Sequence, residues 1–247
     1  MQGTEHNSLL IGGLDPTGGA GILADNSVCQ KMGVKPFTIL TADTIQSNDR
    51  FYAIRWSHPE WIKEQLRLIL KSNVIEVAKI GIIENPAVLY MVVEMLKAAN
   101  PQIKIVWDPI RASTSGQTFY PWRIKDVDAF LAEIYLITPN KKEFLQLTSG
   151  VDEALQFIRA HTHVLIKSYD IDSIEVTDIL FTSSASHRYT YPLHPHHQQV
   201  RGTGCRLASG ILCALIKKQE LQEACSIAGK ALQEYKQSIQ ELKQQVT

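Results

Sequence analysis

Short apolar runs alternate with amphipathic stretches along most of the chain. The runs that have the length of a strand predict strands at residues 8–13, 37–42, 77–83, 103–107, 134–138, 164–167 and 178–181. Most of these runs are apolar throughout, whereas a strand with one solvated face alternates apolar and polar residues. Continuous apolar strands are typical of a parallel sheet that helices cover on both faces.

The stretches between the runs contain helix start signals. Ser57 is a candidate N-cap, with Glu60 three residues later and apolar residues at helical spacing after it. Asn85-Pro86 places a capping residue before a proline and predicts a helix over 87–99. A polar, periodic stretch predicts a long surface helix over 220–245, and residues 182–200 predict a hairpin with a loop. Alternating strands and helices imply right-handed βαβ units in one α/β domain spanning 1–247.

Composition narrows the functional classes. The 247 residues are 45% hydrophobic and 20% charged, with 25 basic and 25 acidic side chains, so we expect a folded chain without nucleic acid as its partner. No apolar run approaches the roughly 18–20 residues that cross a bilayer, so no membrane partner is expected. The start of the chain lacks the basic region of a signal peptide, and the four cysteines form no CxxC pair. We therefore expect a cytoplasmic protein.

A glycine-rich loop follows the first predicted strand. Residues 12–21 contain five glycines around Asp15, which suggests close backbone approach to a ligand, although an ordinary glycine turn is the plainer interpretation. Residues 19–24 match the dinucleotide pattern G-x-G-x-x-A, and this leaves a dinucleotide-dependent oxidoreductase as one hypothesis. The pattern lies six residues beyond the strand, however, and Gly19-Ala20 stands where a P-loop needs Lys and Ser or Thr.

A second glycine site precedes an apolar helical run over 207–215. Gly202-Thr203-Gly204-Cys205 would expose backbone N–H groups at a helix start, where the helix dipole adds positive potential. This combination predicts an anion hole, and a thiol there is expected to have a lowered pKa and to act as a thiolate or base. The alternative is a buried cysteine at a glycine-capped helix start. Cys213 and Cys225 lie on apolar helical faces and are expected in the core.

Residues 13–25, Gly-Leu-Asp-Pro-Thr-Gly-Gly-Ala-Gly-Ile-Leu-Ala-Asp, resemble the N-terminal signature of the hydroxymethylpyrimidine/phosphomethylpyrimidine kinases of thiamine biosynthesis. These enzymes are vitamin kinases of ribokinase-like fold. Further matches follow in order over about 200 residues: Thr41-Ala42 with Gln46, Lys79-Ile80-Gly81, Asp108-Pro109 with Ser115-Gly116, Thr138-Pro139-Asn140 with Glu143, Lys167, and Gly202-Thr203-Gly204-Cys205. The resemblance implies a three-layer α/β/α sandwich with a mostly parallel central sheet.

The resemblance also implies a reaction and the residues behind it. The γ-phosphoryl group of ATP would pass to a hydroxymethyl oxygen or to an existing monophosphate. Cys205 takes the position of the family's catalytic base, and the amides of Gly202, Thr203 and Gly204 would stabilise the transferring group. The residues expected to hold ATP and Mg²⁺ are Asp108, Asn140, Glu143 and Lys167. Contact with Mg²⁺ would run largely through water, so no tight protein-only metal site is expected.

The pyrimidine pocket follows from the same resemblance. Gln46 matches the side chain that pairs with the aminopyrimidine edge, because an amide both donates and accepts hydrogen bonds. The pocket would be completed by Ala20, Asp25, Thr44, Ile82 and Ile110. Because the family is commonly dimeric, we expect a homodimer.

The chain departs from the family pattern in several places. Ser168-Tyr169-Asp170 replaces Gly-Gly-His and would bring bulk and negative charge near the phosphates. Arg201 and Arg206 stand where the family prefers His and Thr, and these cations would aid phosphate binding or lie on the surface. The departures leave open a protein that binds pyrimidine without turnover, and pyridoxal or pyridoxine remains an alternative substrate. The three histidines at 194, 196 and 197 are interpreted as loop residues rather than metal ligands.

Overall fold

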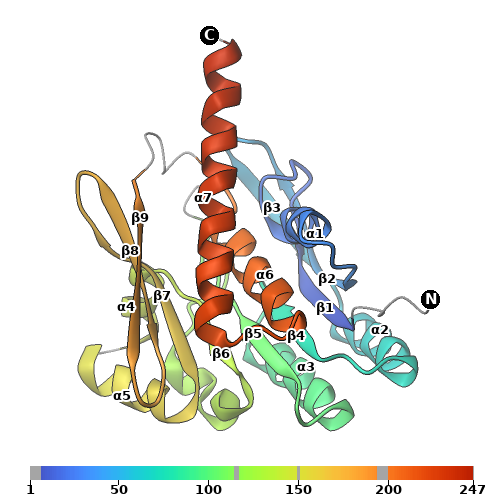
Figure 1. The fold of residues 1–247 in the computed structure, drawn as a ribbon. Helices are drawn as coiled ribbons and strands as arrows, with labels where there is room; N and C mark the ends of the chain where they lie inside the picture. The colour runs from blue at the N-terminus through green and yellow to red at the C-terminus, as the bar shows by residue number, and fades with distance from the viewer. Residues whose placement is uncertain (1–6, 114–116, 149–150, 194–199, 247) are drawn as a thin grey trace, which may run out of the picture.

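A computed structural model of the chain describes residues 7–113, 117–148, 151–193 and 200–246. The Ser115-Gly116 pair and the histidines at 194, 196 and 197 lie outside the described residues. A nine-stranded sheet forms the centre, in the order β3-β2-β1-β4-β5-β6-β7-β8-β9 (Figure 1). The strands are β1 Ser8–Leu14, β2 Phe37–Gln46, β3 Phe51–Trp56, β4 Val77–Ile80, β5 Lys104–Trp107, β6 Leu136–Ile137, β7 His163–Ile171, β8 Glu175–Phe181 and β9 Ser186–Pro192.

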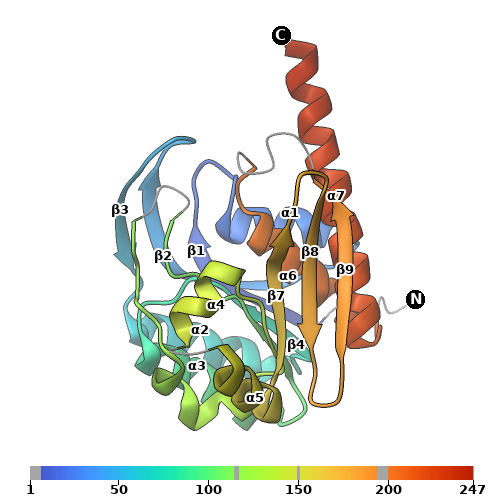
Figure 2. The ribbon, with the colours of Figure 1, turned by 90° about the vertical axis from the view of Figure 1, so that its left-hand side faces the viewer.

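The sheet is parallel from β2 to β7 and antiparallel at its two margins. Strand β3 pairs antiparallel with β2 at one edge, and β8 and β9 continue antiparallel from β7 at the other. The helices are α1 Gly21–Lys31, α2 Pro59–Ser72, α3 Pro86–Ala99, α4 Lys141–Leu147, α5 Val151–His161, α6 Thr203–Ile216 and α7 Leu221–Val246, with 3₁₀ turns at Ile124–Asp126 and Asp128–Glu133. Figure 2 shows α1, α6 and α7 on one face of the sheet and α2, α3 and α5 on the other.

The two faces follow from the alternation of side chains along buried strands. Leu9 and Ile11 of β1 pack with α2 and α3, whereas Leu10 between them packs with α1, α6 and α7. All three side chains are fully buried, so both faces of β1 need apolar residues. Cys213 and Cys225 belong to the second cluster, as predicted. The three-layer architecture expected from the resemblance is confirmed.

The sequence pattern located the central strands and missed two marginal ones. Strands β3 and β9 were not predicted, although β9 falls within the expected hairpin region. The Asn85 cap of α3 is confirmed, because its side chain accepts a hydrogen bond from the Val88 amide. The Ser57 cap is wrong: α2 begins one residue later, and its cap is His58, whose Nδ1 accepts from the Glu60 amide at 3.3 Å. Among the described helices, none is both long and apolar enough to span a membrane.

Candidate active site

A cavity of about 1140 Å³ opens at the carboxyl ends of the parallel strands. This is where ligands of open α/β sheets bind, because the loops that follow the strands converge there. All of the site residues proposed from the sequence line it, namely Ala20, Asp25, Thr44, Gln46, Ile82, Asp108, Ile110, Asn140, Glu143, Lys167, Gly202, Thr203, Gly204 and Cys205. The structure therefore brings together residues that are up to 185 positions apart in the sequence.

The first glycine loop is built around one buried carboxylate. Asp15 Oδ1 accepts hydrogen bonds from the amide and the hydroxyl of Thr17, at 2.9 and 2.7 Å. Its Oδ2 accepts from the Ala20 amide at 3.0 Å. The loop over residues 15–20 thus folds on itself between β1 and α1. A dinucleotide fingerprint requires a tight turn directly from strand to helix, and this loop does not make one.

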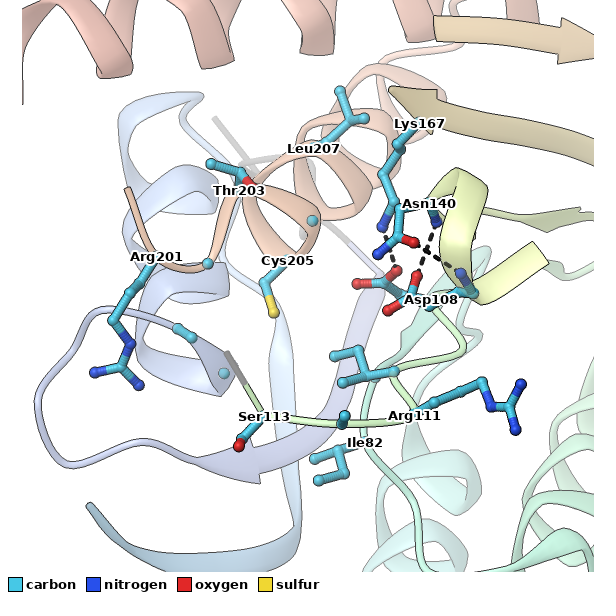
Figure 3. Close-up of a pocket in the computed structure, with 18 of the residues that line it drawn as sticks. Ile82, Asp108, Arg111, Ser113, Asn140, Lys167, Arg201, Thr203, Cys205 and Leu207 are labelled. Atoms are coloured by element: carbon cyan, nitrogen blue, oxygen red, sulfur yellow. Dashed lines mark hydrogen bonds and ion pairs between the residues drawn. The ribbon is translucent and has the colours of Figure 1, made fainter. Parts of the chain in front are cut away.

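The second glycine segment begins α6 against that loop. Gly202 has φ +67°, and a Cβ at this position would overlap the carbonyl oxygen of Gly19. A Cβ on Gly204 would lie 2.8 Å from Lys167 Nζ. Gly202 therefore needs glycine for its conformation and its contact with backbone, whereas a Cβ at Gly204 would displace the Lys167 ammonium. Figure 3 shows Cys205 between the two loops and facing the cavity.

The electrostatic expectation for Cys205 is wrong. Burial raises the pKa of its thiol to about 11, although Lys79 and a hydrogen bond from the Gly21 amide oppose this shift. The thiol is 5% exposed, so desolvation of a thiolate outweighs the favourable helix start. Both interpretations of the sequence hold in part, because Cys205 is buried and also lies at the N-terminal turn of a helix that lines the cavity.

On one side of Cys205, Asp108 and Lys167 form an ion pair. Lys167 Nζ lies 2.8 Å from Asp108 Oδ1, which also accepts from the Thr138 hydroxyl at 3.2 Å (Figure 3). Burial lowers the pKa of Lys167, but the charges of Asp108 and Glu143 more than reverse that effect and raise it. Asp108 Oδ2 is buried and has no hydrogen-bond partner among the described residues. One carboxylate oxygen of a residue that lines the cavity thus has no protein partner among the described residues.

Asn140 and Glu143 cap helix α4 reciprocally. Asn140 Oδ1 accepts from the Glu143 amide, and Glu143 Oε2 accepts from the Asn140 amide, both at 2.8 Å. Burial raises the pKa of Glu143, and the Lys167 charge opposes this effect. Backbone amides thus hold both side chains in place. The charges of Lys167 and Asp108 act on the Glu143 carboxylate.

Asp25 lies in a buried polar cluster beneath the cavity. Lys79 Nζ contacts its Oδ2 at 2.6 Å, and the Ser209 hydroxyl donates to its Oδ1 at 2.8 Å. The side chains of Asp25 and Lys79 are at most 1% exposed. Burial lowers the pKa of Lys79, and the nearby carboxylates more than reverse the effect. Both carboxylate oxygens of Asp25 are therefore already engaged, and the residue joins α1, β4 and α6. Its place beside the substrate stays a prediction.

The structure shows where the residues that depart from the family pattern lie. Ser168 adopts φ +49°, the left-handed region that glycine favours, and its amide donates to Asp178 Oδ1 at 2.7 Å. Ser168 lines the cavity, but neither Tyr169 nor Asp170 does. Asp170 instead pairs with Arg188 at 2.9 Å on the exterior. Tyr169 and Asp170 both contact Lys141 of the cavity wall, so the expected bulk and negative charge lie behind that wall and not in it.

Arg206 was expected to aid phosphate binding or to lie on the surface, and the structure shows neither. It is 8% exposed, and its guanidinium lies 3.8 Å from the ring centre of Tyr235 on α7. It therefore neither lines the described cavity nor lies on the surface. Its role is to pack α6 on α7 through a cation–π contact.

One end of the cavity was not predicted. Asp178, Tyr191, Gln233 and Lys236 line it from β8, β9 and α7. Burial raises the pKa of Asp178 and lowers that of Lys236. The Tyr191 hydroxyl lies against Gly229, a close approach that only a glycine permits. A short motif cannot reveal this end, because its residues come from three elements that meet only in the folded chain.

Comparison with known proteins places the chain in a family. The family model described as phosphomethylpyrimidine kinase matches residues 15–246. A probable thiamine biosynthetic bifunctional enzyme of the chloroplast from Oryza sativa subsp. japonica is 32% identical over 236 residues. That alignment covers 89% of this chain and 42% of the rice protein, so the chain spans less than half the length of this relative.

Solved structures agree on the fold. A phosphomethylpyrimidine kinase from Clostridium difficile 630 is 26% identical and superposes with a TM-score of 0.75, covering 92% of this chain and 98% of that one. A pyridoxal kinase from Staphylococcus aureus in complex with AMP-PCP is 22% identical with a TM-score of 0.75, covering 90% and 84%. The second likeness concerns the fold alone. The family model, which spans nearly the whole chain, shows that this protein belongs to the phosphomethylpyrimidine kinase family.

Proposed function

We propose that the protein is an ATP- and Mg²⁺-dependent kinase that phosphorylates 4-amino-5-hydroxymethyl-2-methylpyrimidine, its monophosphate, or both. One observation carries this proposal. The same cavity holds Cys205, the backbone amides at the start of α6, the Asp108–Lys167 pair and the amide of Gln46. Phosphoryl transfer depends on positioning and electrostatics, and these groups supply both without a covalent intermediate.

The proposed step uses the chain's own groups in defined roles. Cys205 as thiolate takes the proton of the substrate hydroxyl, whose oxygen then forms a bond to the γ-phosphorus while the bond to the β-phosphate oxygen of ATP breaks. Amides at the start of α6 donate to the transferring group, and the helix dipole favours its negative charge. Lys167 offers a cation beside the same helix start, and its raised pKa keeps it charged at neutral pH.

The donor set fits Mg²⁺. Asp108 Oδ2 is a buried carboxylate oxygen without a partner among the described residues, and Glu143 lies in the same wall of the cavity. Mg²⁺ takes one or two carboxylates and completes its coordination with water and phosphate oxygens. Asp108 and Glu143 would hold the ion, which supplies neutralisation of the β- and γ-phosphates when it is bound. The S. aureus pyridoxal kinase of the same fold binds the ATP analogue AMP-PCP, which supports a nucleotide in this cleft.

Pyridoxal is the nearest alternative substrate, since it too has a hydroxymethyl group on a small aromatic ring. The family match and the half-buried Gln46 amide both favour an aminopyrimidine. A chain that binds pyrimidine without turnover is the other alternative, and the position of Tyr169 and Asp170 outside the cavity wall counts against it.

A substrate panel tests the proposal. ADP release is followed with ATP and Mg²⁺ on hydroxymethylpyrimidine, its monophosphate and pyridoxal, and phosphorylated products are identified by mass spectrometry. We expect turnover on the pyrimidine, with the KM of Gln46→Ala raised for pyrimidine and unchanged for ATP. Turnover of pyridoxal alone would make pyridoxal the substrate. Pyrimidine binding without any turnover would refute the proposal that the protein is a kinase.

Three further expectations accompany the proposal. We expect one domain over residues 1–247, a cytoplasmic protein and a homodimer. The exposed Ile45 and Tyr52 at the β2–β3 margin, 66% and 59% exposed, give the sheet edge an apolar surface suited to a second copy. Sedimentation equilibrium of wild type and of Ile45→Glu tests the dimer, which we expect the substitution to weaken.

A further inference from the structure

Arg201 joins three segments at the end of the cavity that Gln46 lines. It precedes Gly202, and its side chain is 17% exposed. Nη2 lies 3.0 Å from Asp15 Oδ2 and 2.6 Å from Gln46 Oε1. Nη1 lies 3.3 Å from the Thr17 hydroxyl and 3.1 Å from the carbonyl oxygen of Ser47. A single guanidinium therefore connects the first glycine loop, the β2–β3 turn and the approach to α6.

These contacts leave Arg201 little capacity for a phosphate. Its positive charge is matched by Asp15, which is 3% exposed and also organises the glycine loop. Both terminal nitrogens already donate to protein oxygens. In Figure 3, Arg201 and the Asp108–Lys167 pair lie on opposite sides of Cys205. Arg201 thus belongs to the end of the cavity where the substrate ring would bind.

The hydrogen bonds fix the direction of the Gln46 amide. Arginine only donates, so the amide atom 2.6 Å from Arg201 Nη2 must be the oxygen. At the other end, the Thr44 hydroxyl donates its proton to the carbonyl oxygen of Leu14 at 2.8 Å. Thr44 can therefore only accept from Gln46 Nε2, which lies 2.8 Å away. The two ends agree and define one chain of donors running from Arg201 through Gln46 and Thr44 to Leu14.

These hydrogen bonds leave one acceptor and one donor of the Gln46 amide for a ligand. Its Oε1 keeps one lone pair and its Nε2 keeps one N–H, an acceptor and a donor on the same amide. An aminopyrimidine presents the complement, a ring nitrogen that accepts beside an exocyclic amino group that donates. Pyridoxal has no amino group beside its ring nitrogen, so it cannot satisfy both valences of the amide at once.

We propose that Arg201 is a positioning residue that determines specificity, because it locks the Gln46 amide in the orientation that recognises a 4-aminopyrimidine. The inference rests on the proposed function and identifies how the same site chooses its substrate. Without the arginine, only the Thr44 contact holds the amide, and the orientation that recognises the amino group is less strongly favoured. Arg201 acts through Gln46 and touches no reacting atom.

The test compares two substrates on a set of variants. The probes are 4-amino-5-hydroxymethyl-2-methylpyrimidine and the analogue without the 4-amino group, and the measured quantity is the ratio of their kcat/KM values. Arg201→Met removes all donors at similar length, and Arg201→Lys keeps the charge near Asp15 but loses the planar fork. The matched control is Arg67→Met, an exposed arginine paired with Glu64 within α2 and outside the cavity wall. Circular dichroism and Tm establish that each variant is folded.

We expect Arg201→Met and Arg201→Lys each to lower the discrimination ratio about tenfold through the pyrimidine KM. Their kcat and the KM for ATP should stay within about twofold of wild type, a split that a merely structural role would not produce. In a Gln46→Ala background, Arg201→Met should change the ratio by less than about twofold, because the two residues act as a unit. Arg67→Met should behave as wild type.

Two outcomes would overturn the inference. The first is an unchanged ratio in both folded Arg201 variants, and the second is an equal loss in the presence and absence of Gln46. If Arg201→Met does not fold, Arg201→Lys decides the question, measured alone and in the Gln46→Ala background. Failure of the proposed function is a separate result, since it shows as absence of turnover in the wild-type protein on either probe.

Discussion

The pH dependence of turnover tests the proposed role of Cys205 in detail. With a thiol pKa of about 11, only about one molecule in a thousand holds the thiolate at pH 8. Below pH 11, the amount of thiolate therefore rises about tenfold with each unit of increasing pH, because deprotonation is far from complete throughout that range. We predict that kcat/KM for the pyrimidine rises about 100-fold from pH 7 to pH 9.

The assay measures ADP release at saturating ATP and Mg²⁺ over this pH range, with Cys205→Ala beside the wild type. The variant should lose roughly 10²- to 10⁴-fold in turnover, as expected for loss of a general base, and should lose the slope as well. Parallel slopes in the two proteins would mean that another group or the substrate itself titrates. A flat wild-type profile would mean that the thiolate is not the base.

Three further substitutions test the packing around the site. Gly202→Ala should lower the free energy of unfolding by about 2–3 kcal/mol in urea titration, because it combines a positive φ with overlap of backbone. Gly33→Ala is its control, because Gly33 shares the positive φ but has open space around it, and it should cost only about 1–2 kcal/mol. Equal losses of stability in the two variants would refute the contact between Gly202 and Gly19. Lys79→Met should cost about 3–5 kcal/mol by leaving Asp25 buried without its counter-ion, and wild-type stability would contradict that pairing. Arg206→Met should cost about 1–2 kcal/mol and leave the KM for ATP unchanged, whereas a raised KM would return Arg206 to phosphate binding.

The parts of the fold that were predictable are those with strong local signals. The central strands are apolar on both faces, so their runs stand out against the amphipathic helices. Strand β3 is partly exposed along its length, and β9 alternates between half-buried and exposed residues. Such marginal strands lack a continuous apolar run, and only their partners β2 and β8 define them.

The positions of the site residues were predictable, but their electrostatics were not. The glycine segment and the apolar run after it located Cys205 at a helix start, where local reasoning favours a low pKa. Burial of the thiol arises only in the folded chain, and it raises the pKa more than Lys79 and the Gly21 amide lower it. The role proposed for Arg201 arises in the same way. A single departure from the family pattern marked the residue, but its partners Asp15 and Gln46 become neighbours only through tertiary structure.

Identification of the product tests the central claim most directly. The protein is incubated with ATP, Mg²⁺ and hydroxymethylpyrimidine, and the pyrimidine is analysed by mass spectrometry beside a Cys205→Ala control. We predict a phosphorylated pyrimidine that forms in step with ADP and falls sharply in the control. Unmodified pyrimidine, with calorimetry still showing that it binds, would contradict the kinase and leave a pyrimidine-binding protein of the same fold.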